Sequence, residues 1–294
     1  MKKSLIFLII IIIIAVATYV LFLKPDKPIA ILNVEQGFVQ VKTNNDWVQA
    51  QNGMEIKKNT LIKTSVNSKA SVIFFNNNII RLDENTEISV NEMISKSTSD
   101  KISIYQNSGQ TWTKIIKLSG VETDYEIQTP TTIASVRGTA FTTQTLQDGS
   151  SKLLVSKGNV KLSSYRIENE KLVIIGTRDI KESEKINVTK SKLDELIVER
   201  KTEVSDWERE NLEKDEQFRR EARVRRMLQK SFILRQLMKQ NNLSFQELVD
   251  LLEKYEKGEI ELKIFTQKGE KLQELTKKQL SELIKKVKQE EVEE

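Results

Sequence analysis

Residues 129–141 read Thr-Pro-Thr-Thr-Ile-Ala-Ser-Val-Arg-Gly-Thr-Ala-Phe, and this stretch indicates the fold of the first half of the chain. Its β-branched and small residues are typical of a strand, and its glycine permits a bulge or a close approach of two backbones. Turn residues, such as Asn-Asn-Asn at 76–78 and Asp-Gly-Ser at 148–150, separate further short runs of the same character. The pattern predicts an all-β unit. Those further runs lie at 38–41, 70–75, 79–82, 152–155, 160–162 and 172–175.

Two internal similarities accompany these runs. A glycine followed by alternating residues occurs at Gly37, Gly109 and Gly158. Residues 62–72 also resemble residues 127–136, with Ile-x-Thr followed by Ala-Ser-Val in both. Self-similarity of this kind favours stacked units, so we expect a roll, a short solenoid or a sandwich.

The N-terminal segment is strongly apolar. Residues 5–23 carry no charge, follow Lys2 and Lys3, and would span about 28 Å as a helix. This pattern predicts a single-pass membrane anchor with the bulk of the chain outside the cytoplasm. A cleaved signal peptide is the alternative, with Ala15-Val16-Ala17 as its cleavage site.

Composition excludes several classes of site. The chain of 294 residues has no cysteine and no histidine, which removes thiol nucleophiles, Ser-His-Asp triads and imidazole or thiolate metal sites. We therefore expect no cofactor and no metal. The formal net charge of +5 is too small to identify a partner.

The last third is denser in charge and reads as helical. Ser191, Ser205 and Ser244 each precede an acidic residue by three positions, the spacing of a helix N-cap. We expect a helix after each of these serines, with the main helices at 206–240, 245–255 and 271–288. The predicted fold class is α+β by domain: a transmembrane helix and linker (1–28), an all-β domain (29–190) and a charged α-helical domain (191–294).

The ordered motifs of the β part resemble the FecR domain. The stretch at 129–141 matches that family's Thr-Pro entry and Val-Arg-Gly-Thr-x-Phe core, and Val155, Gly158 and Val160 match its closing pattern. Upstream matches extend the resemblance to roughly residues 31–165. They are Gly37, Val39, Val41, Trp47, Gly53, Leu61, Thr64, Ser68, Ala70, Phe74, Arg81 and Leu82.

The resemblance implies an extracytoplasmic β-domain behind a single membrane helix. The family's namesake passes a signal from an outer-membrane siderophore receptor to a sigma factor through a cytoplasmic segment. Only residues 1–4 precede the apolar run here, so we do not expect direct sigma-factor control to carry over, and iron sensing loses its support with it. The expected role is a binding or adaptor module in envelope signalling or scaffolding, with an envelope protein or a wall glycan as ligand.

Three residues of the β part are candidates for ligand binding. Arg137 could bind a carboxylate or phosphate through its guanidinium, and an internal pairing with Thr129 and Thr139 is the structural alternative. Trp47 and Trp112 could stack on a sugar, whereas an aromatic at strand spacing is more often a core residue.

A basic run lies in the long helix. Arg219, Arg220, Arg223, Arg226 and Lys230 form its candidate face, which could meet anionic lipid, a wall polymer or an acidic protein. Nucleic acid is not expected as a partner. The structural alternative is a solvated face paired with acids earlier in the same helix, namely Glu208, Glu210, Glu213 and Asp215.

The expectation for catalysis is that the chain is not an enzyme. The alternative is a wall-glycan enzyme that uses paired carboxylates, for which Asp83 with Glu84 and Glu122 with Asp124 are the available pairs.

Overall fold

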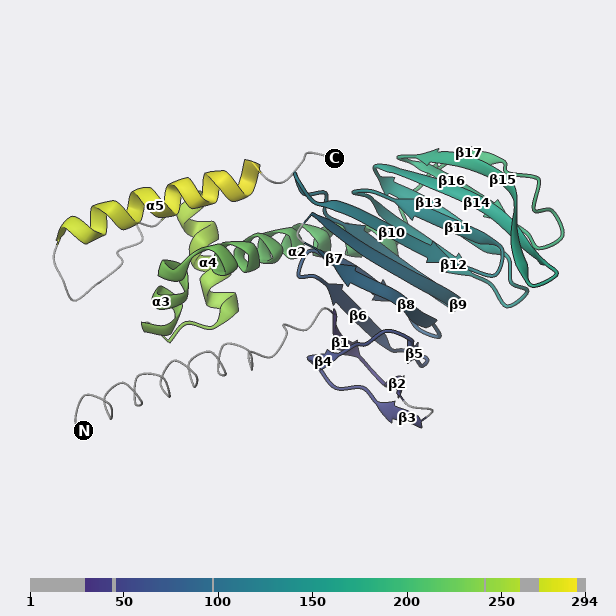
Figure 1. Ribbon diagram of the computed structural model, residues 1–294, viewed down its shortest axis with the longest axis horizontal. Coiled ribbons are helices and arrows are strands. Elements are labelled where there is room, and N and C mark those ends of the chain that lie inside the picture. The colour runs from purple at the N-terminus through teal and green to yellow at the C-terminus, as the bar shows by residue number, and fades with distance from the viewer. Residues whose placement is uncertain (1–29, 44–45, 97, 241, 260–269, 290–294) are drawn as a thin grey trace, which may run out of the picture.

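The computed structural model describes residues 30–43, 46–96, 98–240, 242–259 and 270–289. They form seventeen strands followed by four helices (Figure 1). The strands of the first half are β1 (Ala30–Gln36), β2 (Val39–Thr43), β3 (Asp46–Gln49), β4 (Met54–Glu55), β5 (Thr60–Thr64), β6 (Lys69–Phe74), β7 (Asn78–Leu82), β8 (Glu87–Ser95) and β9 (Ser99–Ile115). The remaining strands are β10 (Glu122–Gln128), β11 (Thr132–Val136), β12 (Ala140–Thr145), β13 (Ser151–Lys157), β14 (Asn159–Glu168), β15 (Lys171–Lys181), β16 (Glu184–Val188) and β17 (Val198–Arg200).

The strands form two layers that share the long strand β9. Sheet A has the order β4–β1–β6–β7–β9–β12–β13–β16–β17 and uses the C-terminal part of β9. Sheet B has the order β3–β2–β5–β8–β9–β10–β11–β14–β15 and uses its N-terminal part. One hydrophobic core lies between the two inner faces. Of the three architectures predicted for the β part, the sandwich is the one observed.

The three glycines of the predicted repeat mark corners where the chain changes sheet. Gly37 joins β1 to β2, Gly109 lies where β9 passes from sheet B to sheet A, and Gly158 joins β13 to β14. Their φ angles are +71°, +85° and +87°. A Cβ at Gly109 would lie 2.4 Å from the Cα of Thr86, so the corner needs both the left-handed backbone and the absent side chain. The second similarity has no structural counterpart, because 62–72 spans both sheets and 127–136 is a hairpin within sheet B.

The helices are α2 (Asp206–Lys230), α3 (Phe232–Gln240), α4 (Phe245–Glu256) and α5 (Glu270–Gln289). The helix expected at 206–240 is interrupted at Ser231, whose backbone is extended and whose Oγ accepts a hydrogen bond from the backbone N–H of Leu234. Ser205 and Ser244 cap α2 and α4 as predicted.

The prediction of a helix after Ser191 is wrong. Residues 189–197 form turns, and β17 follows them. Ser164 Oγ donates a hydrogen bond to the carbonyl of Leu193, and Leu196 packs beside Gly176. These contacts hold the segment against the sandwich in place of a helix.

The predicted fold class also needs correction. The described residues are mostly β-sheet with a C-terminal helical region. No helix among them is long and apolar enough to cross a membrane. Residues 5–23, where the transmembrane helix was expected, lie outside the described residues.

Candidate functional site

Helix α2 lies on the outer face of sheet A through a buried polar cluster. Arg81 of β7 and Trp112 of β9 are directly opposite each other in the sheet, and both side chains reach Asp215 of α2. Arg81 Nη1 lies 2.5 Å from one carboxylate oxygen, and Trp112 Nε1 donates to the other over 3.0 Å. The three residues are at most 4% exposed. The cluster fixes the helix at one point of the sheet.

Burial and charge oppose each other at Asp215. Burial raises the pKa of its carboxyl above the ordinary 3.8, while Arg81, Lys114 and the Trp112 hydrogen bond act to lower it. A carboxylate held in this way depends on its cationic neighbours to remain charged. Removing either partner of the ion pair therefore leaves a buried charge without compensation.

The same helix belongs to two separate hydrophobic clusters. Phe218 and Ala222 pack with Ile79 and Ile116 of the sandwich. Two residues after Ala222, Val224 is the first member of the core of the helical region, and Figure 1 shows α2 running from the strands to the other helices. The buried members of that second core are Val224, Met227, Leu234, Leu248, Val249, Leu252, Leu280, Ile284 and Val287. A single helix thus packs against both the sandwich and helices α3, α4 and α5.

A second polar contact lies at the beginning of α2. Glu208 is 1% exposed, accepts a hydrogen bond from Ser156 Oγ over 2.5 Å and forms an ion pair with Lys201. Lys69 lies 3.1 Å from a carboxylate oxygen of Glu210, and its ammonium stands 5.4 Å from the centre of the Trp207 ring. The acidic first half of α2 therefore faces cations of the sandwich.

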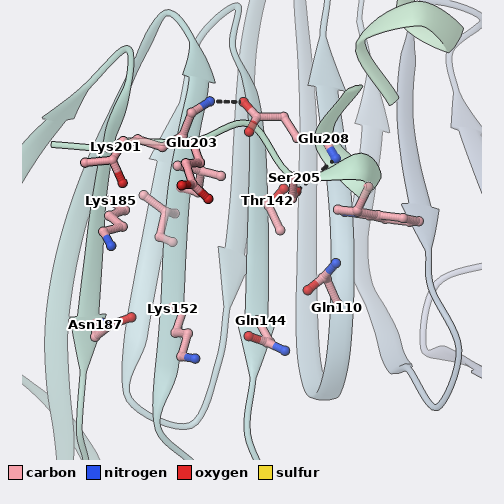
Figure 2. A pocket seen from close by; sticks show the side chains of 14 residues that line it. Gln110, Thr142, Gln144, Lys152, Lys185, Asn187, Lys201, Glu203, Ser205 and Glu208 are labelled. Atoms are coloured by element: carbon pink, nitrogen blue, oxygen red, sulfur yellow. Dashed lines mark hydrogen bonds and ion pairs between the residues drawn. The ribbon is translucent and has the colours of Figure 1, made fainter. Parts of the chain in front are cut away.

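A pocket of about 370 Å³, open to solvent, adjoins this contact (Figure 2). Strands β9, β12, β13 and β16 of sheet A form its floor. Residues 201–208 form its wall, and the ion pair between Lys201 and Glu208 crosses that wall. The lining is mixed: lysines, amides and acids lie beside the apolar side chains of Leu153, Leu154 and Trp207. We take this pocket, together with the helix beside it, as the candidate functional site.

The predicted ligand-binding residues lie apart from one another. Trp112 is completely buried beneath α2, so its ring is not available to a ligand. Trp47 is 40% exposed on the edge strand β3, with Lys42 Nζ 6.0 Å from its ring centre. Arg137 is exposed and forms a 2.6 Å ion pair with Glu122 rather than an internal contact. Ligand roles for Trp47 and Arg137 stay predictions.

The basic run faces the helical region. Arg220 pairs with Glu253 and Arg223 with Glu256, each over 3.6 Å, so α4 supplies acids to this face. Arg226 is 7% exposed, Arg219 is half-buried and Lys230 is exposed. The acids that were expected to pair with the run within α2, Glu208, Glu210 and Asp215 among them, face sheet A instead.

The carboxylate pairs considered for catalysis occupy other surroundings. Glu84 accepts a hydrogen bond from the backbone N–H of Asn67, and Glu122 is bound to Arg137. Burial raises the pKa of Asp83 above its ordinary 3.8. None of these residues lines the pocket beside α2.

Sequence reasoning missed Asp215 and Glu208 as the residues that join the two halves. The available signal was Arg81, a lone cation within the apolar run 79–82. Such a residue needs a buried acid as its partner, and the acid-rich first half of the helix after Ser205 supplies one.

The comparison with family models agrees with the resemblance described above. Residues 60–161 match the family model described as FecR protein, which confirms the predicted FecR domain over that part of the chain. Two crystal structures from Parabacteroides distasonis, described as a "putative anti-sigma factor", align over 48% of this chain at 15% identity, with TM-scores of 0.38 and 0.37. The aligned part spans 59% of those chains. No curated protein matches the sequence.

Proposed function

The chain carries a FecR domain over residues 60–161, a domain of a regulatory family, and from this premise we propose that it is a regulatory adaptor of envelope signalling. In this proposal the sandwich binds a protein or glycan ligand, and α2 carries the effect to α3, α4 and α5. The helices in turn contact a protein partner.

One observation supports the proposal most strongly: α2 is part of two cores. Its first half is fixed to sheet A by the Arg81–Asp215 pair and by Phe218, whereas its second half carries Val224 and Met227 of the helical core. A change in how the helix sits on sheet A must therefore move the helical region, since packed cores transmit strain.

The experiment interrupts α2 between its two cores. Arg223→Pro breaks the helix there, at a cost of about 3 kcal/mol, because proline removes a backbone donor and clashes with the preceding turn. Arg223→Ala is the matched control, since it removes the Glu256 ion pair and keeps the helix. Both variants are returned to cells from which the native gene has been deleted.

Transcript profiling provides the readout. We expect deletion to change a defined set of transcripts, and we expect wild type and Arg223→Ala to restore it. Arg223→Pro should fail to restore it at an equal protein level. An unchanged transcript profile after deletion would refute the regulatory role, and full restoration by Arg223→Pro would refute transmission through α2.

We further propose that the chain acts outside the cytoplasm. The support is the uncharged run at 5–23 behind two lysines, a pattern read by the export machinery. A reporter fused at the C-terminus and active only in the cytoplasm would contradict this location.

A further inference from the structure

The floor of the pocket carries a straight row of polar side chains. Gln110, Gln144, Lys152 and Asn187 come from four adjacent strands and lie directly opposite one another in the sheet. Figure 2 shows them side by side across the strands. Neighbouring strands are about 4.8 Å apart, so the row presents a polar group at that interval.

Three residues that line the pocket, one on its floor and two on its wall, have a side-chain polar atom with no hydrogen-bond partner among the described residues. These atoms are Thr142 Oγ1 on β12, Trp207 Nε1, and Glu208 Oε2 on the first turn of α2. Thr142 is 9% exposed and Glu208 is 1% exposed. The Thr142 hydroxyl, the Trp207 N–H donor and one Glu208 carboxylate acceptor in this pocket could therefore each form a hydrogen bond with a ligand.

One cation of the pocket is also available. Lys201 is paired with Glu208, and Lys185 lies 3.2 Å from Glu199. Lys152, in the middle of the row, has no ion pair among the residues that the structure describes. An anionic group of a ligand could bind it.

The sheet itself argues against a peptide strand as the ligand. Strands β9, β12 and β13 each have neighbours on both sides, and β16 has β13 on one side and β17 along residues 184–186 on the other, so most of their backbone groups are already paired. An added strand requires a free sheet edge. Recognition here must use side-chain amides and hydroxyls, which donate and accept as sugar hydroxyls do.

We propose that this pocket binds a segment of an acidic saccharide. The segment lies along the row, across the strands, with a carboxylate at Lys152 and hydroxyls at Gln144 and Asn187. This inference rests on the proposed function, since it names the class of ligand that the adaptor binds.

The wall connects the ligand to α2. Residues 201–205 have no regular structure, line the pocket beside Thr142 and Glu208, and are tied to Glu208 by the Lys201 ion pair. A saccharide that displaces this segment reaches both groups. Because Glu208 belongs to the first turn of α2, binding then acts on the helix that joins the two cores.

Calorimetric titration of the full chain tests the proposal with three probes: a hyaluronan hexasaccharide, a neutral chitin hexasaccharide and a hexaglutamate peptide. We expect the acidic saccharide to bind best. Lys152→Met should weaken its binding about tenfold, the loss of one charge-assisted hydrogen bond. Thr142→Val, which keeps the shape of the side chain, should weaken it as well. Lys161→Met on sheet B, an exposed lysine outside the pocket, is the matched control and should change nothing.

Three results would overturn the proposal: no binding of hyaluronan by the wild type, equal binding of hexaglutamate, or equal weakening by the Lys152 and Lys161 variants. None of them affects the transcript experiment. If the saccharide fails to bind while Arg223→Pro still blocks restoration, this site is refuted and the regulatory role stands.

Discussion

The buried pair between Arg81 and Asp215 gives the sharpest test of how α2 is held. Asp215→Asn keeps the size of the side chain and removes its charge, which leaves the guanidinium of Arg81 buried at 4% exposure without its counter-charge. Breaking a buried ion pair in this way costs about 3–5 kcal/mol. We expect a loss of that size in the free energy of unfolding at pH 7.

Urea unfolding followed by tryptophan fluorescence measures this loss, because Trp112 donates directly to Asp215 and reports on the same contact. Glu216→Gln is the matched control. Glu216 is the next acid of the same helix and is exposed, so its replacement should change stability by less than about 0.5 kcal/mol.

A double variant tests whether the loss of stability in Asp215→Asn comes from the unpaired guanidinium of Arg81 or from the change in the protein's net charge. Arg81→Met with Asp215→Leu replaces both charges by apolar groups, a change that is often close to neutral for a buried pair. It also leaves the Trp112 N–H without its acceptor, at a cost of about 1–3 kcal/mol, which is smaller than the cost of the unpaired guanidinium. We expect the double variant to be more stable than Asp215→Asn. A cost below about 1 kcal/mol for Asp215→Asn, or a double variant less stable than the single one, would refute the reasoning.

Three further outcomes are expected. Gly109→Ala should destabilise the chain by more than Gly53→Ala, for which we expect a loss of roughly 1 kcal/mol. Both glycines have a positive φ, but only Gly109 lacks space for a Cβ. Thermal unfolding of the two variants compares their losses. Burial raises the pKa of Asp100 above 3.8 in the folded chain, so the stability linked to its proton is complete below pH 3.8 and is lost as pH rises through the folded value. Asp100→Asn should therefore raise the melting temperature at pH 7 and leave it unchanged at pH 3. An equal change in melting temperature at the two pH values would contradict a raised pKa for Asp100. Trp112→Phe removes the indole donor to Asp215 and should lower the free energy of unfolding in urea by about 1–3 kcal/mol. An unchanged free energy of unfolding would contradict a stabilising role for this hydrogen bond.

The local features of the fold were predictable from the sequence. Gly37, Gly109 and Gly158 were recognised as a repeat, and all three lie at corners between the sheets, because only glycine fits those turns. Ser244 was recognised as a cap, and its hydroxyl and Glu247 form the reciprocal pair expected. Signals of this kind depend on neighbours within a few residues.

The features that depend on distant residues were not predictable. Arg81 and Asp215 are 134 positions apart, and no periodicity connects them. Ser191 has the same local spacing as Ser205, yet only Ser205 begins a helix, because the segment after Ser191 is bound to Ser164 and packed beside Gly176. Tertiary contacts decide between sequences that look alike locally.

Amide hydrogen exchange along α2 in the full chain tests the central claim most directly, namely that this helix is an integral part of both the sandwich and the helical region. We predict that the amides of residues 210–227 exchange as slowly as those of β7 and β9, because the helix opens only together with the cores that it joins. Rapid exchange throughout α2 while β7 and β9 stay protected would contradict the account, since the helix would then be only loosely attached to the sheet.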